Sequence, residues 1–252
     1  MRSGELSVHP DDRDWLNKRK PDVLKQDRIN SFSEYVGSKR FDSRDNELHL
    51  SLLPKPYVGD LTNAKVLIFL QNPGLQPADY FAEDHQDFRS LAESNLSQSF
   101  PGHYPFFVLD PGFAWTSGYI WWESKLRPVI NDLQKSGVCD TYQNALRYVA
   151  ERVAAVELFP YHSADSGSLN AIPKWHEMPS VLQAQAFFDN ACKDSSKLKL
   201  IVRSHKHWDC SRKMENCDHI HFAPKTRGFT FNRAVESEAR VAGEMLMDFL
   251  TK

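Results

Sequence analysis

Apolar runs and amphipathic stretches alternate along most of the chain. Near-continuous apolar runs cover residues 65–70, 154–159 and 198–202. Runs of this length without polar alternation are typical of strands that are covered on both faces. Helical periodicity precedes the second run at residues 142–152 and the third at residues 180–194. Strands that alternate with helices predict a parallel sheet in an α/β fold.

The rest of the pattern completes this fold. Residues 219–223 alternate between apolar and polar and predict a fourth strand, and residues 234–250 predict an amphipathic closing helix. We therefore expect a three-layer α/β/α architecture around a central, mainly parallel, four-stranded sheet. Residues 1–53 mix charges with isolated apolar positions, which favours an N-terminal helical extension before an α/β domain at residues 54–252.

Length, composition and charge narrow the class of protein. The chain has 252 residues, 41% of them apolar and 25% charged, which suits one substantial core. Its apolar runs fall short of the roughly 20 residues that span a bilayer, and residues 1–14 do not have the basic-then-apolar pattern of a signal peptide. We expect a soluble, cytoplasmic monomer without a membrane partner. The formal net charge of −2 means that any nucleic-acid contact would depend on a local basic patch.

Polar, aromatic or basic residues follow each expected strand. In an open α/β sheet, ligands bind beyond the carboxyl ends of the strands, so these exits are the first place to look for chemistry. The exits are residues 71–75, 160–163, 203–208 and 224–229.

The first exit carries an Asn-Pro-Gly turn. Pro73 fixes one φ angle, Gly74 permits a tight turn and close ligand approach, and Asn72 is thereby presented rigidly. A neutral amide can orient a water molecule or hold a substrate atom without the desolvation cost of a buried charge. The alternative is a turn-forming tripeptide without a chemical role.

Two segments at the start of the expected sheet resemble a known family. They read Pro54-Lys55-Pro56-Tyr57-Val58-Gly59 and Ala64-Lys65-Val66-Leu67-Ile68-Phe69-Leu70-Gln71-Asn72-Pro73-Gly74-Leu75. Together they resemble the opening of the uracil-DNA glycosylase superfamily, and the Asn-Pro-Gly form is similar to its mismatch-specific branch. The similarity extends more faintly to the C-terminus. In that family the first exit positions water, a downstream aromatic residue stacks on the extruded base, and the last exit supplies a loop that clamps and wedges DNA.

The resemblance implies roles for individual residues. Asn72 matches the water-positioning asparagine, and Phe106 or Phe107 lies in the segment that holds the base-stacking ring. Ser117 lies where the family begins a helix near the DNA backbone. Trp121 and Trp122, a few residues on, are more typical of core positions. The base-binding loop also includes Gln71, Pro73 and Gly74.

Two departures from the family pattern bear on specificity and mechanism. Glu157 stands where the family usually has an asparagine that binds the base edge. An ionised carboxylate only accepts hydrogen bonds, so it suits an amino group and predicts a cytosine derivative or another amino-bearing base rather than uracil. The alternative is an ordinary strand residue that pairs with an arginine. Residues 223–225 stand in place of the family's His-Pro-Ser, so the histidine of that motif is missing. We expect His162 or His205 to supply a proton or polarise the base instead. The alternative is that both histidines are structural.

A basic and aromatic segment follows the fourth expected strand. Its lysine and arginines suit phosphate contact, and its phenylalanines suit insertion between bases. Arg227 falls where the family has its wedge, and the alternative is a solvated loop. The residues expected to contact DNA are Lys225, Thr226, Arg227 and Phe229, with Phe231 and Arg233 beyond them and Arg203, Lys206 and His207 as a possible enlargement of the same surface.

Other functions remain as alternatives. Thiols and imidazoles gather at Cys210, Cys217, His219 and His221, but their spacing matches no common zinc site, so we expect neither a metal nor a cofactor. The first exit contains no lysine, which favours monofunctional cleavage without a Schiff base. Such an enzyme would leave an abasic site, in repair or in defence against modified foreign DNA. The alternatives are a non-catalytic DNA- or nucleotide-binding module and a metal-dependent phosphoesterase, which is disfavoured because carboxylates do not cluster at strand ends.

Overall fold

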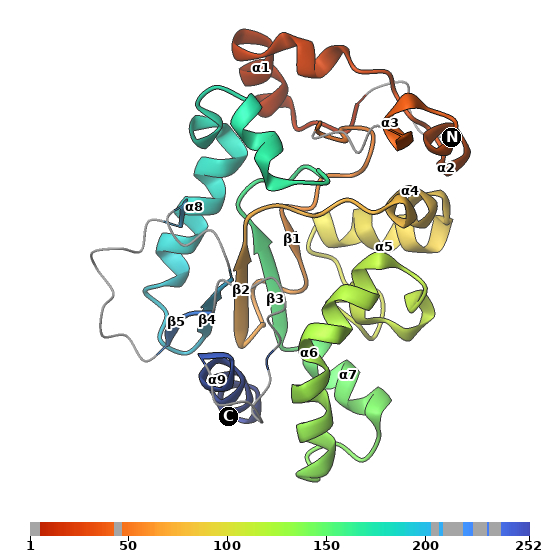
Figure 1. The fold of residues 1–252 in the computed structure, drawn as a ribbon. Coiled ribbons are helices and arrows are strands. Elements are labelled where there is room, and N and C mark those ends of the chain that lie inside the picture. Colours follow the sequence, from red (N-terminus) through yellow and green to blue (C-terminus); the bar gives the residue numbers. More distant parts are fainter. Residues whose placement is uncertain (1–5, 43–46, 203–206, 209–218, 224–230, 232–237) are drawn as a thin grey trace.

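The computed structural model describes residues 6–42, 47–202, 207–208, 219–223, 231 and 238–252. Figure 1 shows the arrangement of the elements in this part of the chain. The helices are α1 (Pro10–Arg19), α2 (Phe32–Val36), α3 (Lys39–Asp42), α4 (Pro77–Asp84), α5 (Gln86–Leu96), α6 (Ser117–Lys135), α7 (Tyr142–Ala150), α8 (Pro179–Ala191) and α9 (Glu238–Thr251). The strands are β1 (Tyr57–Val58), β2 (Val66–Leu70), β3 (Val153–Glu157), β4 (Leu198–Ile201) and β5 (Ile220–Phe222). Short 3-10 helices are η1 (Pro21–Lys25), η2 (Phe107–Leu109), η3 (Pro111–Phe113), η4 (Ser166–Ala171) and η5 (Trp175–Glu177).

The sheet is mainly parallel, as the sequence predicts. Its strand order is β1-β3-β2-β4-β5, and the β3, β2, β4 and β5 ladders are all parallel. The expectation of four strands is wrong, because the described sheet has five. The additional strand, β1, is only two residues long and pairs antiparallel with the outer edge of β3, with Tyr57 opposite Val156. Two residues are too few to show a periodic pattern in a sequence.

Both faces of the sheet are covered, which explains the unbroken apolar runs. All five residues of β2 are buried. Val66, Ile68 and Leu70 pack in one cluster with residues of α6, α7 and α9, whereas Leu67 and Phe69 pack in a second cluster with residues of α8 and α1. The central position of β2 therefore accounts for the lack of polar alternation.

The N-terminal residues pack directly on the rest of the chain. In Figure 1, α1, α2 and α3 lie beyond the carboxyl ends of β2 and β3. The carboxylate of Asp12, which is fully buried, accepts hydrogen bonds from the Tyr161 hydroxyl at 2.7 Å and from the Ser180 amide, in the first turn of α8, at 3.0 Å. The His49 amide donates to the carbonyl oxygen of His162 at 2.9 Å. The expected extension therefore borders the exits of the strands. No helix in the described part of the chain is long and apolar enough to cross a membrane.

Candidate active site at the carboxyl end of the sheet

The loop at residues 71–75 leaves the central strand and is held by the chain that follows β3. The amides of Leu158 and Phe159 donate to the carbonyl oxygens of Leu70 at 3.2 Å and Gln71 at 2.9 Å. The Ser163 amide then donates to the carbonyl oxygen of Pro73 at 3.4 Å. Backbone hydrogen bonds between these two segments therefore continue beyond the end of the β2–β3 ladder. The chain that follows β3 thus fixes the path of the loop.

Gly74 is exposed on this loop and faces open space. A Cβ atom at this position would meet nothing within 4 Å. The residue is not among the glycines with positive φ, so the turn itself does not demand a glycine. The space beside Gly74 is therefore open, and the backbone conformation does not require a glycine at this position.

The side chain of Asn72 is oriented by two hydrogen bonds. Its Nδ2 donates to the carbonyl oxygen of Pro73 at 3.0 Å and to the Oγ of Ser163 at 2.9 Å. A carbonyl oxygen can only accept, so the amide nitrogen must lie on that side. Among the described residues, no donor bonds to Asn72 Oδ1. This oxygen is therefore placed to accept a hydrogen bond from water or substrate.

Ser163 is a buried residue whose importance the sequence did not reveal. Its Oγ accepts from Asn72 and donates to the carbonyl oxygen of Asp165 at 2.8 Å. The single hydroxyl hydrogen is thereby committed, so a lone pair faces the amide of Asn72. The sequence offered one signal for its role, namely that Ser163 is a polar residue at the exit of the strand next to β2.

His162 is buried and bonds to the same loop. Its Nδ1 lies 2.8 Å from the carbonyl oxygen of Gly74, which can only accept, so Nδ1 carries the proton. Burial, together with a smaller effect of the nearby Lys55 ammonium, lowers the pKa of His162 to about 3. The ring is therefore neutral near pH 7, and its buried Nε2 is an acceptor with no hydrogen-bond partner among the described residues. In this state the imidazole has no proton at Nε2 to donate to a leaving base.

Ser117 begins α6 and bonds to the first turn of α4. Its Oγ donates to Asp79 Oδ1 at 2.5 Å, while Asp79 Oδ2 accepts from the Gln76 amide at 2.7 Å. The Asp79 carboxylate thus joins the starts of the two helices near the end of the loop. A carboxylate in this place repels a phosphate group, so the geometry does not favour the expected backbone contact by Ser117.

Glu157 ends β3 beside the end of β2. It is opposite Leu70 in the parallel ladder and half-buried. Because side chains alternate along a strand, Glu157 shares the face of Val153 and Ala155, which is also the face of Leu70. The structure therefore brings Glu157 to the edge of the sheet from which the Asn72 loop leaves.

The two candidate stacking rings lie in the core. Phe106 is 0% and Phe107 is 3% exposed. The Phe106 ring meets Trp122 edge-on at 4.8 Å between centroids, and Phe107 meets Phe88 at 5.5 Å. Neither ring offers a free face to a nucleobase in this conformation.

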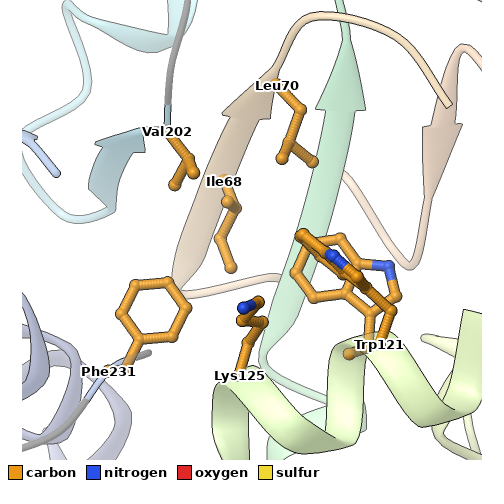
Figure 2. A pocket seen from close by; sticks show the side chains of 7 residues that line it. Ile68, Leu70, Trp121, Lys125, Val202 and Phe231 are labelled. Carbon is orange, nitrogen blue, oxygen red and sulfur yellow. The ribbon is translucent and has the colours of Figure 1, made fainter. Parts of the chain in front are cut away.

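A small apolar hollow lies on the same face of the sheet, between the sheet and α6 (Figure 2). Figure 2 shows its walls, which are formed by Ile68, Leu70, Val202, Trp121, Trp122, Lys125 and Phe231. Its free space is about 10 Å³, room for roughly one water molecule. A nucleobase would therefore require the walls to move. Trp121 and Trp122, which the sequence assigned to the core, pack in the core and also line this hollow.

Phe231 is the described residue of the expected basic and aromatic segment. It is buried, and its amide donates to the carbonyl oxygen of Lys125 at 3.1 Å. The Lys125 ammonium lies 5.6 Å from the centroid of the Trp121 ring. Phe231 is therefore part of the wall of the hollow rather than an exposed wedge.

Several predicted site residues lie outside the described residues. These are His205, Lys225, Thr226, Arg227 and Phe229, together with Arg203, Lys206, Arg233, Cys210 and Cys217. His207 packs edge-on against Trp175 at 5.1 Å, and His219 Nε2 lies 3.1 Å from the carbonyl oxygen of Cys192. In the described ranges, no three His, Cys, Asp or Glu side chains group as a metal site would require.

An exposed aromatic cluster near the start of α6 was not apparent in the sequence. Phe81 and Trp115 are 42% and 39% exposed, and their ring centroids are 5.4 Å apart. The exposed ring of His85 lies 4.8 Å from Phe81 and 4.7 Å from Trp115. These rings come from different segments, so no local pattern marks them as a group.

Comparisons with protein-family models, curated proteins and solved structures found no match to this chain.

Proposed function

We propose that this chain is a monofunctional DNA glycosylase on a uracil-DNA glycosylase-like fold. The observation that carries the proposal is the orientation of Asn72 at the exit of the central strand. Its nitrogen is held by Pro73 and Ser163, so Oδ1 is left as the acceptor. A rigid neutral acceptor at this edge of a parallel sheet suits a group that orients a water nucleophile.

The proposed reaction begins with extrusion of the target nucleotide. A base inside a duplex is shielded, so leaving the stack costs a few kcal/mol, which contacts in the site must offset. As the N-glycosidic bond lengthens, positive charge develops on the sugar and negative charge on the base. Water that donates a hydrogen bond to Asn72 Oδ1 then attacks C1′ of the sugar as the C1′–N bond breaks. The added water loses its proton to solvent, and the departing anionic base takes up a proton from solvent. The loop contains no lysine, so no Schiff base forms and the product is an abasic site.

Glu157 is the residue to which we assign base selection. Its place beside Leu70 puts a carboxylate at the edge of the sheet that also carries Asn72. An ionised carboxylate accepts from an exocyclic amino group and repels a carbonyl oxygen. The proposed substrate is therefore a cytosine derivative or another amino-bearing base, released in repair or in defence against modified foreign DNA.

The exposed aromatic cluster supports a nucleic-acid partner. Unpaired bases stack on aromatic side chains, with about 1–3 kcal/mol per base lost on alanine substitution. Phe81, His85 and Trp115 present such rings close to the first turn of α6. Asp84 and Asp87 lie nearby in the sequence, so contact here would depend on stacking rather than on attraction for phosphate.

The test is base release from oligonucleotides that each carry one modified base, followed by alkali to cut abasic sites. Asn72→Ala should lower the single-turnover rate by about 100-fold or more, because the nucleophile loses its orientation. Asn170→Ala, an identical change at an exposed position, should leave it unchanged. Full activity of Asn72→Ala would refute the proposal.

A second candidate is a non-catalytic module that binds DNA or nucleotides. The burial of Phe106 and Phe107 favours this candidate, because neither ring offers a face on which an extruded base could stack. The exposed rings of Phe81 and Trp115 can contact unpaired bases without a catalytic pocket. The two candidates differ in one measurement. Binding of modified oligonucleotides without any abasic site, in the wild type as in Asn72→Ala, would support the module.

A further inference from the structure

Two consecutive residues after β3 bond to three consecutive residues of the Asn72 loop. Ser163 accepts from Asn72 Nδ2 at 2.9 Å, and its amide donates to the Pro73 carbonyl at 3.4 Å. His162 donates from Nδ1 to the Gly74 carbonyl at 2.8 Å. Both side chains are 1% exposed. These three hydrogen bonds therefore tie the chain after β3 to the whole of this short turn.

We propose that His162 and Ser163 are positioning residues that hold the Asn72 loop and aim Asn72 Oδ1 at the reacting sugar. We call this pair the His162–Ser163 clamp. Neither residue touches the substrate or transfers a proton in this proposal, and it rests on the proposed glycosylase function.

Ser163 sets the rotation of the amide. The terminal torsion of an asparagine side chain has broad, shallow preferences, so its direction depends on its hydrogen bonds. Without Ser163, the Pro73 carbonyl would be the one described acceptor left for Nδ2. Because the hydroxyl hydrogen already bonds to Asp165, Ser163 can meet Asn72 only as an acceptor. This favours one amide orientation, with nitrogen inward and oxygen outward.

His162 sets the position of the backbone two residues further along. Its neutral ring donates through Nδ1 to Gly74. This geometry uses the imidazole as a fixed donor to the main chain. The neutral ring has no second proton to give to a departing base. We therefore assign His162 the role of a positioning residue rather than the general acid that the sequence suggested.

The first experiment is a double-mutant cycle on the single-turnover rate. Ser163→Ala should lower the rate about 10-fold or more in the wild-type background, since a misplaced group can cost two orders of magnitude. In the Asn72→Ala background it should have no further effect, because Ser163 acts through Asn72. Equal fold-losses in both backgrounds would overturn the clamp.

The second experiment compares three variants of His162. In His162→Asn, the amide nitrogen can occupy the place of Nδ1 and donate to Gly74, whereas His162→Ala removes the donor. His162→Gln extends the amide to the place of Nε2. We expect His162→Asn to keep the rate within about threefold of wild type and the other two variants to lose about 10-fold. If His162→Asn loses as much as His162→Ala, the ring acts by more than the Gly74 bond and the clamp is wrong.

A third measurement separates the clamp from the proposed function and from misfolding. In the ¹⁵N-labelled full chain, Ser163→Ala should speed the hydrogen exchange of the Asn72 side-chain amide, while the backbone spectrum elsewhere is unchanged. Unaltered exchange would disprove the clamp whether or not the protein releases bases. If exchange is faster but the protein releases no base from any substrate, the His162–Ser163 clamp is supported and the glycosylase function is refuted.

Discussion

The buried imidazole of His162 should make the stability of the fold depend on pH. Burial lowers its folded pKa to about 3, whereas the unfolded ring has an ordinary pKa of 6.5. The unfolded chain therefore binds a proton between these two values and the folded chain does not. Protonation favours unfolding, so the contribution of this residue is fully present above about pH 6.5 and is lost as the pH falls towards 3.

The size of the effect follows from the two pKa values. Each pH unit within this window costs about 1.4 kcal/mol of unfolding free energy per proton. Between pH 7.5 and pH 5.0, the ring titrates over the 1.5 units below its unfolded pKa of 6.5. The expected loss is about 2 kcal/mol. His162 is buried, so solvent does not screen its charge appreciably.

Urea denaturation at the two pH values measures this loss. The wild-type chain also has other groups that titrate in this range, so the comparison is with His162→Asn, which keeps a donor for Gly74 and removes the titration. The wild type should lose about 2 kcal/mol more than His162→Asn between pH 7.5 and 5.0. An equal pH dependence in both proteins would mean that the ring is not buried in its neutral form, and would refute the reasoning.

Three further variants test the site and its support. Gly74→Ala should change the free energy of unfolding by no more than about 0.5 kcal/mol, because open space surrounds the position, and a large loss of stability would contradict this geometry. The same variant should lower the rate of base release if the ligand approaches Gly74. Asp12→Ala should lower the free energy of unfolding, measured by urea titration, by about 3 kcal/mol, because the buried Tyr161 hydroxyl and an α8 amide lose their acceptor. The same change at the exposed Asp11 should lower it little. Glu157→Gln should raise excision of carbonyl-bearing bases relative to amino-bearing ones in competition assays, and an unchanged ratio would remove Glu157 from base selection.

The sequence alone predicted four of the five described strands and the helices α7, α8 and α9, but it did not predict α4 or α5. The runs at residues 65–70, 154–159 and 198–202 correspond to β2, β3 and β4 within two residues at each end. Burial on both faces forces such strands to be apolar throughout, so the composition of a short segment reveals them. The helices at α7 and α8 were visible for a similar reason, since a one-sided apolar stripe repeats every few residues.

The sequence also located the candidate loop but not what orients it. An Asn-Pro-Gly turn after a buried strand is a local feature, and its place follows from the end of the strand. The partner that orients Asn72 lies 91 residues away, in Ser163. Which polar residue at one exit meets which residue at the next depends on strand order and register, and neither is written in any short segment.

Only the tertiary structure decided several other features. β1 exists because Tyr57 and Val58 find the free edge of β3, not because two residues favour a strand. Phe106 and Phe107 are apolar residues in an irregular segment, and only packing shows that both are buried rather than open to a base. Local sequence sets the propensity and polarity of each segment. Burial and hydrogen-bond partners are properties of the whole assembled chain, and the chemistry proposed for Asn72 depends on those partners.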